Sequence, residues 1–297
     1  MDTTKSVLIA GGSGLIGKQL TKMLIERGYS VYKLSRNAGK QGYIQWDPRL
    51  KKVDEKHLDR IHILINLAGA NIGDKNWTTA RKKELIDSRV QSTEFLSEIA
   101  AKMPKLSYYI GASGVNCYDE NQQKVFQESD DYGSDFLSTL VRDWETASDR
   151  FSGICPYMKL RIAMVLSNQG GSLNAMKGPI KFGLGSPLGT GNQFHPWIHI
   201  DDLCRMILFG IDNKLEGTYN AVAECDTNRT MMKGIAKYMH RPFFLPAVPS
   251  AILKFFLGER SMLVLADLRV SNEKIKNTGF VFKYDKLNKA LKVLFSK

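Results

Sequence analysis

Hydrophobic positions follow two alternating patterns along the first two thirds of the chain. Short runs of mostly apolar residues, such as SVLIA at 6–10, predict buried strands, and longer segments with apolar residues at helical spacing predict helices. Strands that alternate with helices form a parallel, doubly wound sheet, whose ligands bind beyond the carboxyl ends of the strands. The pattern therefore predicts an α/β fold. The predicted strands are 6–10, 30–36, 61–70, 106–113, 157–166 and 217–222, and the predicted helices are 15–28, 79–102, 134–151 and 200–211.

The turn between the first strand and the first helix is rich in glycine, with the segment GGSGLIG at 11–17. Glycine supplies backbone angles closed to other residues and lets main-chain N–H groups approach a phosphate at the positive end of a helix. Tight turns without a ligand also use glycine, but this turn lies inside a strand–helix–strand unit, which is typical of a Rossmann-type dinucleotide site. We expect the pyrophosphate to contact Gly11, Gly14, Leu15, Ile16 and Gly17.

The regular alternation ends after Leu166. Residues 167–196 carry many glycines and little periodicity, and long loops of this kind are usually functional. We expect residues 1–166 to form an NAD(P)-binding Rossmann domain to which 197–223 returns. Residues 167–196 and 224–297 would then form a substrate-binding loop and a smaller mixed C-terminal substrate domain.

Composition narrows the class of protein. With 297 residues, 43% of them hydrophobic, the chain can bury a sizeable core. The most apolar run, AILKFFLG at 251–258, is far shorter than the roughly 20 residues of a membrane span, and the N-terminus lacks the pattern of a signal peptide. We therefore expect a cytoplasmic protein with no membrane partner.

Cysteine and histidine spacing excludes two further classes of site. The four cysteines have no short CxxC spacing, which argues against a disulfide framework and against zinc. Only one pair of histidines is close, His195 and His199 in HPWIH, and no carboxylate or cysteine accompanies it at metal-ligand spacing. We expect no metal.

The formal net charge of +12 raises the question of a nucleic-acid partner, because a basic surface attracts phosphate polymers. The basic residues are spread through most of the helices, and the clusters RKKE at 81–84 and RLKK at 49–52 are short and flanked by acids. This distribution favours a solvated face or attraction for small anions. We expect a small-molecule substrate and no nucleic acid.

Several segments resemble the extended short-chain dehydrogenases/reductases, the NAD(P)-dependent epimerase/dehydratase family that includes nucleotide-sugar epimerases. GGSGLIG at 11–17, NLAGA at 66–70 and GASGVNCY at 111–118 carry the resemblance. SRVQST at 88–93, the segment 183–203 and the segment 241–265 resemble its YfcH-type branch, which has a C-terminal domain of unknown function. The resemblance covers essentially the whole chain. Relatives often pair through the helices expected here at 79–102 and 134–151, so a homodimer is one state to test.

The expected cofactor is NADP, with NAD less favoured. In NLAG, the small residues Ala68 and Gly69 let the cofactor approach the strand end, and Asn66 caps nearby backbone groups. Arg36 closes the second strand, where an NAD-selective protein places an acid on the ribose 2′-hydroxyl, and no acidic residue follows before Asp47. An arginine can fork onto a 2′-phosphate, although an arginine after a strand is often merely exposed.

The resemblance implies a catalytic tyrosine with a lysine one helical turn later. The chain has a single Tyr-x-x-x-Lys, Tyr29 to Lys33, and it falls on the second strand. The corresponding helix positions are occupied by Phe136 and Leu140, neither of which can transfer a proton. The standard dyad is therefore expected to be missing.

Three other positions are candidates for the chemistry. The first is Ser113 or, in a shifted alignment, Gly114, at the strand end where the family keeps a hydroxyl. The others are Tyr118 nearby and His195 in the glycine-rich loop.

Three hypotheses follow. The protein is an oxidoreductase or epimerase with a relocated acid/base that acts on a sugar-like or carbonyl substrate, or it senses NADPH with little turnover, or it uses its basic surface on nucleic acid.

Overall fold

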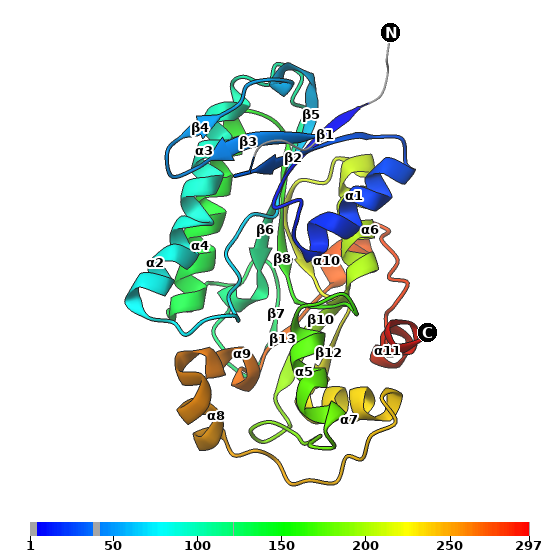
Figure 1. The fold of residues 1–297 in the computed structure, drawn as a ribbon. Helices are drawn as coiled ribbons and strands as arrows, with labels where there is room; N and C mark the ends of the chain where they lie inside the picture. The colour runs from blue at the N-terminus through cyan, green and yellow to red at the C-terminus, as the bar shows by residue number, and fades with distance from the viewer. Residues whose placement is uncertain (1–4, 38–41, 121, 297) are drawn as a thin grey trace.

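The structure is a computed structural model that describes residues 5–37, 42–120 and 122–296 (Figure 1). Its centre is an eight-stranded sheet with the order β11-β8-β6-β5-β1-β2-β3-β4, whose pairings in the described part are parallel except for β3 with β4. The chain builds outward from β1 in both directions, which confirms the predicted doubly wound, Rossmann-type α/β fold. The strands are Ser6–Ala10 (β1), Ser30–Ser35 (β2), Tyr43–Asp47 (β3), Lys52–Val53 (β4), Ile61–Asn66 (β5), Tyr108–Gly114 (β6), Tyr157–Ile162 (β8) and Gly217–Ala221 (β11).

Helices lie on both sides of this sheet. Helices α1 (Leu15–Glu26) and α6 (Ile200–Asn213) pack together on one side, and α2 (Thr79–Asp87), α3 (Val90–Ala100) and α4 (Phe136–Asp149) lie on the other (Figure 1). Side chains of β1 alternate between the two layers, since Val7 and Ile9 join the hydrophobic cluster of α1 and α6, whereas Leu8 joins that of α3. Burial on both faces explains why β1 is apolar from Val7 to Ala10.

Two of the predicted elements are each divided in two. The expected helix at 79–102 breaks at Ser88 and Arg89, because both side chains bond to the backbone around them rather than continuing the helix face. The expected strand at 157–166 ends at Ile162 and resumes as β9 (Met164–Leu166) in a different sheet. Strands β3 and β4 are additions that the hydrophobic pattern did not predict.

The remaining elements form a second lobe. A three-stranded sheet with the order β12-β10-β9 contains β10 (Phe194–His199) and β12 (Glu224–Thr227), and a two-stranded sheet pairs β7 (Val125–Phe126) with β13 (Arg269–Val270). The helices of this lobe are α5 (Ser172–Lys181), α7 (Asn228–Tyr238), α8 (Ser250–Leu257), α9 (Met262–Leu265), α10 (Glu273–Asn277) and α11 (Leu287–Phe295). Short 3-10 helices lie at Leu58–Arg60, Val115–Cys117, Arg150–Gly153 and Gly258–Ser261.

The segment 167–196 is not the one long loop that its sequence predicts, and this prediction is wrong. Helix α5 occupies its first half, with Leu173 and Ile180 buried, and β10 begins before it ends. His195 and His199 consequently lie on a buried strand and not in a glycine-rich loop. The glycine spacing concealed the helix, because glycines lie before, within and after it.

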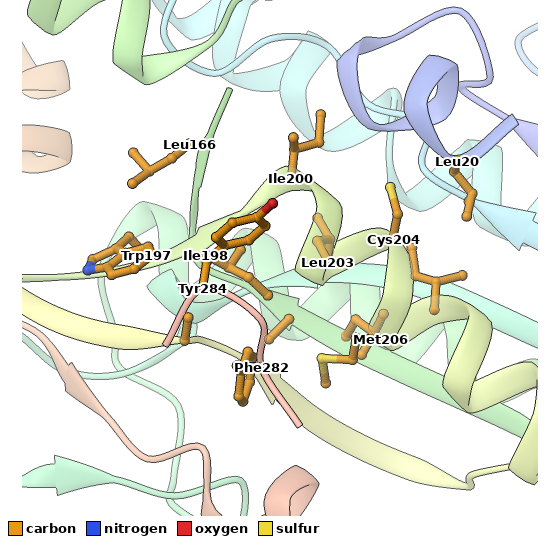
Figure 2. Packing of buried hydrophobic residues seen from close by; sticks show 14 of the residues in the cluster. Leu20, Leu166, Trp197, Ile198, Ile200, Leu203, Cys204, Met206, Phe282 and Tyr284 are labelled. Atoms are coloured by element: carbon orange, nitrogen blue, oxygen red, sulfur yellow. The ribbon is translucent and has the colours of Figure 1, made fainter. Parts of the chain in front are cut away.

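One hydrophobic cluster joins the two lobes. Trp197 of β10 and Leu166 of β9 lie close to Leu203 of α6, and Phe282 and Tyr284 from the C-terminal segment cover the same cluster (Figure 2). Trp197 and Leu203 are completely buried. This shared core fixes the position of the second lobe over the carboxyl ends of the large sheet's strands.

Candidate functional site

Two glycines shape the turn between β1 and α1. Gly11 has a φ of +77°, and a Cβ atom added there would lie 2.5 Å from the carbonyl oxygen of Leu67. A Cβ atom added to Gly17 would lie 2.5 Å from the carbonyl oxygen of Gly11. Both distances are well below van der Waals contact, so the conformation and close packing of the turn require glycine at these positions.

Gly14 has a different role in the same turn. Its φ of −72° is open to any residue, and an added Cβ atom would have only the Gly11 carbonyl oxygen nearby, at 3.3 Å. Gly14 is the N-cap of α1 and supplies no side-chain cap, and the next residues, Leu15 and Ile16, are half-buried. The N–H groups of this first turn carry the partial positive charge that binds phosphates. Gly14 keeps the space in front of them clear.

The turn after β5 lies directly against the glycine turn. The amide of Leu67 donates to the carbonyl of Ala10 at 2.9 Å. Asn66 is completely buried; its Oδ1 accepts from the amide of Ala68 at 3.1 Å, and its Nδ2 donates to Thr93 Oγ1 at 2.8 Å. Asn66 therefore caps the backbone and fixes the strand end that faces the phosphate position.

A half-buried arginine, Arg89, lies beside this strand end and was not among the predicted site residues. A Cβ atom added to Gly69 would lie 3.0 Å from the Arg89 guanidinium carbon. That guanidinium donates to the carbonyls of Leu85 and Ala70 at 3.1 and 3.0 Å and lies 5.2 Å from the centre of the Trp144 ring. Burial, reinforced by the charge of Arg81, lowers the pKa of Arg89 to about 10, so it stays charged at neutral pH.

No carboxylate of the described residues forms an ion pair with Arg89. A half-buried cation that is satisfied only by carbonyls and an aromatic ring retains donors for an anion or a hydroxyl group. The segment SRVQST at 88–93 contained this arginine. Hydrophobic periodicity alone gave no reason to single it out.

Two cations lie at the end of β2. Arg36, one residue beyond the strand, is exposed, and none of the described carboxylates pairs with it. Lys33, which the prediction did not include as a binding residue, lies against Gly12: a Cβ atom added to Gly12 would be 2.8 Å from the Lys33 Cγ. Residues 38–41 lie outside the described part of the chain.

Ser113 is buried inside an ionic network. Its hydroxyl donates to Glu145 Oε1 at 2.5 Å, Arg161 donates to both oxygens of the same carboxylate at 2.8 and 3.1 Å, and the Tyr132 hydroxyl donates to Oε2 at 2.8 Å. Burial alone would raise the pKa of Glu145, but the bonds from Arg161, Ser113 and Tyr132 together lower it. Glu145 is therefore ionised at neutral pH, and its carboxylate accepts the hydrogen bond that the Ser113 hydroxyl donates.

Tyr118 belongs to the same network. Its hydroxyl donates to Asn220 Oδ1 at 2.7 Å and accepts from Arg161 at 3.0 Å, and its ring stacks on Phe126 with the centres 4.8 Å apart. The side chain is 1% exposed, and burial raises its pKa despite the nearby Arg161. A neutral, bonded and buried phenol of this kind fits a structural role.

His195 lies in a different part of the structure from these groups. It lies on β10, 6% exposed, with Nε2 3.5 Å from Asn228 Nδ2. Burial lowers its pKa to about 4, against a small opposite effect of Asp267, so the ring is neutral at pH 7. The structure therefore joins Ser113 and Tyr118 through Arg161 and Glu145, whereas His195 belongs to another sheet.

Helix α4 begins without a proton-transfer group at the two expected positions. Phe136 packs on Trp77 with ring centres 5.4 Å apart and on Lys82, whose Nζ is 5.0 Å from the Phe136 ring centre. Leu140 is 2% exposed. The Tyr29–Lys33 pair starts between α1 and β2, so it cannot replace them.

A narrow pocket lies between the start of α4 and the C-terminal segment. It has a volume of about 10 Å³, which is room for one water molecule at most. Glu120 faces it, and burial, together with the charges of Asp135 and Asp119, raises the pKa of Glu120. Glu120 is the titratable carboxyl that sequence reasoning missed here. The lining residues are Asn116, Tyr118, Glu120, Asp135, Leu137, Met262 and Leu268.

Other classes of site find no support in the described residues. No group of three or more His, Cys, Asp or Glu side chains among them is placed to hold a metal ion, and the four cysteines are all free. None of the helices described has the length and apolar character needed to cross a membrane.

Two family models match separate parts of the chain. Residues 7–139 match the NAD dependent epimerase/dehydratase family, and residues 248–294 match a domain of unknown function, DUF1731. The mouse epimerase family protein SDR39U1 is 33% identical over 293 residues, which are 96% of this chain and 98% of the mouse protein. The epimerase family protein SH2119 of Staphylococcus haemolyticus is 35% identical over 302 residues, covering 98% of this chain and 99% of that protein.

Solved structures agree. The crystal structure of human SDR39U1 (isoform 2) with NADPH has a TM-score of 0.89 and 32% identity, and the match covers 98% of this chain and 99% of that one. The nucleoside-diphosphate sugar epimerase of Corynebacterium glutamicum has a TM-score of 0.79 and 28% identity, with 97% and 57% covered. These likenesses confirm the family resemblance, and this chain belongs to the NAD dependent epimerase/dehydratase family, in the group whose members carry the C-terminal domain of unknown function.

Proposed function

We propose that this protein binds NADPH and acts as an oxidoreductase or epimerase on a polar substrate, sugar-like or carbonyl. The observation that carries the proposal is the open N-terminus of α1 beside the glycine turn, with basic and no acidic side chains at the end of β2. The human relative's structure with NADPH supports the same cofactor. The pyrophosphate oxygens would accept hydrogen bonds from the backbone N–H groups of Leu15 and Ile16. Arg36 and Lys33 would face the 2′-phosphate.

The strand end after β5 supplies the second side of the cofactor site. Ala68 and Gly69 give the backbone a close approach to the cofactor, and Arg89 offers its free donors there. The family's usual lysine binds the nicotinamide ribose and adds a positive charge near it. Arg89 is a half-buried cation beside Gly69, and we assign it to contact cofactor oxygens.

Proton transfer would fall to Glu120. Its raised pKa allows the carboxyl to hold a proton, and it faces the pocket between the two lobes. Because that pocket has room for a single water molecule, a sugar-sized substrate requires the segment around Met262 to move away from α4.

A second candidate function is an NADPH sensor with little turnover. The observation that favours it is the burial of all three predicted catalytic side chains, Ser113, Tyr118 and His195, each less than 7% exposed. The domain division at Leu166, pairing of two copies through α2, α3 and α4, and a cytoplasmic location stay predictions.

Turnover separates the two candidates. NADPH oxidation would be followed against a panel of carbonyl compounds and sugar nucleotides with the wild-type protein and with Glu120→Gln. The enzyme hypothesis expects activity that falls about a hundredfold in Glu120→Gln with unchanged NADPH affinity. Tyr118→Phe is the matched variant, and it should keep most of the activity. NADPH binding without turnover of any compound would favour the sensor.

A further inference from the structure

Helix α8 has no buried residue, although six of its eight residues are apolar. Phe255 is 83% exposed, Phe256 72% and Ile252 46%. Apolar side chains scattered singly over a surface are normal, but a whole helix turn of them is not. The helix lies within the segment that matches the domain of unknown function.

The neighbouring loops extend the same apolar surface. Phe182, Leu184 and Phe244 are 78, 58 and 77% exposed. The loop after α5 and the segment that leads to α8 lie side by side, because the amide of Gly189 donates to the Val248 carbonyl at 2.9 Å and the amide of Val248 donates to the Pro187 carbonyl at 2.8 Å. These segments and α8 form the lower end of the molecule in Figure 1.

Most of the charge on this end of the molecule is basic, and the first carboxylate after α8, Glu259, is paired with Lys82 at 2.5 Å. The chain has no acidic residue between Asp149 and Asp201, and none between Asp226 and Glu259. These two stretches include α5, α7, α8 and the loops just described. Six cations on them are exposed and form no ion pair with a described carboxylate: Lys181, Arg229, Lys233, Lys237, Arg241 and Lys254.

We propose that this surface docks on an anionic phospholipid bilayer. Aromatic and aliphatic side chains of an exposed helix insert at the boundary between headgroups and acyl chains, while lysine and arginine attract anionic headgroups. Both halves of that chemistry are present here without a carboxylate among them. A second copy of the chain is less suitable, because two such basic surfaces repel each other. The sequence-based expectation of no membrane partner would then hold only for spanning segments.

Vesicle co-sedimentation tests the proposal. The full-length protein should bind vesicles of phosphatidylcholine mixed with phosphatidylglycerol and not vesicles of phosphatidylcholine alone, and salt should weaken the binding. Lys254→Gln should lower the partition coefficient about fivefold, and Phe255→Ser with Phe256→Ser should lower it at least about tenfold. Leu50→Ser should have no effect, because it changes a 64% exposed side chain between β3 and β4, which lie at the opposite end of the molecule (Figure 1).

Two controls keep the result interpretable. NADPH affinity and the thermal unfolding midpoint should be unchanged in all variants, since every replaced side chain is exposed. Absence of vesicle binding, or equal binding to neutral and anionic vesicles, would overturn the proposal. So would self-association of the wild-type protein that Phe255→Ser and Phe256→Ser abolish without any effect on vesicles, which would assign the surface to a second copy.

Discussion

Among single residues, Gly14 matters most to the proposed phosphate site, because the absence of a side chain there leaves room for the phosphate. Gly11 and Gly17 are required by backbone contacts, whereas Gly14 has an ordinary φ and open space. A larger side chain at Gly14 would therefore crowd the phosphate, while the backbone of the turn could keep its conformation. The difference separates loss of binding from loss of folding.

Gly14→Val should therefore abolish NADPH binding and leave a cooperative unfolding transition. A valine at the N-cap is poor but tolerated, so we expect the unfolding midpoint to fall by only about 2–4 °C. Gly17→Val, by contrast, drives a side chain into the backbone of Gly11 and Gly12 and should destabilise the fold itself. Fluorescence titration with NADPH and a thermal melt measure both effects. Normal titration by Gly14→Val would place the cofactor elsewhere.

Residue type was easier to predict than residue environment. The sequence identified Asn66 as a backbone cap, and Asn66 bonds to the Ala68 amide. It identified Ser113 and Tyr118 as hydroxyls near a strand end but could not show that Glu145 and Arg161 occupy them, since these partners come from α4 and β8. Such contacts depend on tertiary packing that no local pattern contains.

At the scale of elements, the break between α2 and α3 positions the site. The apolar stripe continues across residues 79–102, so hydrophobic periodicity predicts one helix there. The Ser88 hydroxyl accepts the Ala70 amide at 3.0 Å and Arg89 donates to the Ala70 carbonyl, and these bonds hold the loop after β5. Similarly, the apolar run at 157–166 contains no signal for the change of sheet at Ala163.

Replacing Arg89 tests this arrangement. Arg89→Met keeps the volume and removes the charge, so NADPH affinity should fall about tenfold or more, as expected for loss of a charge-assisted hydrogen bond. Stability should change little, because loss of two hydrogen bonds is offset by removal of a half-buried cation that no described carboxylate pairs with. Lys83→Met on the exposed face of α2 is the control. Equal NADPH affinity in the wild type and Arg89→Met would exclude the assigned contact.

At the scale of the whole molecule, the lobes share one core, so buried groups in the second lobe affect global stability. His195 has a folded-state pKa of about 4, whereas an unfolded histidine has about 6.5. Between these values the unfolded chain binds a proton that the folded chain does not. The free energy of unfolding should therefore fall as pH falls from 6.5 to 4.

Urea unfolding at pH 7 and pH 4.5 measures this contribution. We expect His195 to account for about 2–3 kcal/mol of the stability lost between the two pH values. His195→Gln should lack that part of the loss, while other titrating groups remain the same in both proteins. An identical pH dependence in the wild type and the variant would show that His195 is not buried as a neutral ring.

The central claim is that this fold selects NADPH through the cations at the end of β2. Dissociation constants of the wild-type protein for NADPH and NADH, measured by nucleotide fluorescence at fixed ionic strength, test it most directly. We predict that NADPH binds about tenfold to a hundredfold more tightly, which is the value of one or two charge-assisted hydrogen bonds, and that Arg36→Glu removes or reverses the preference. Equal constants for the two nucleotides in the wild-type protein would contradict the account.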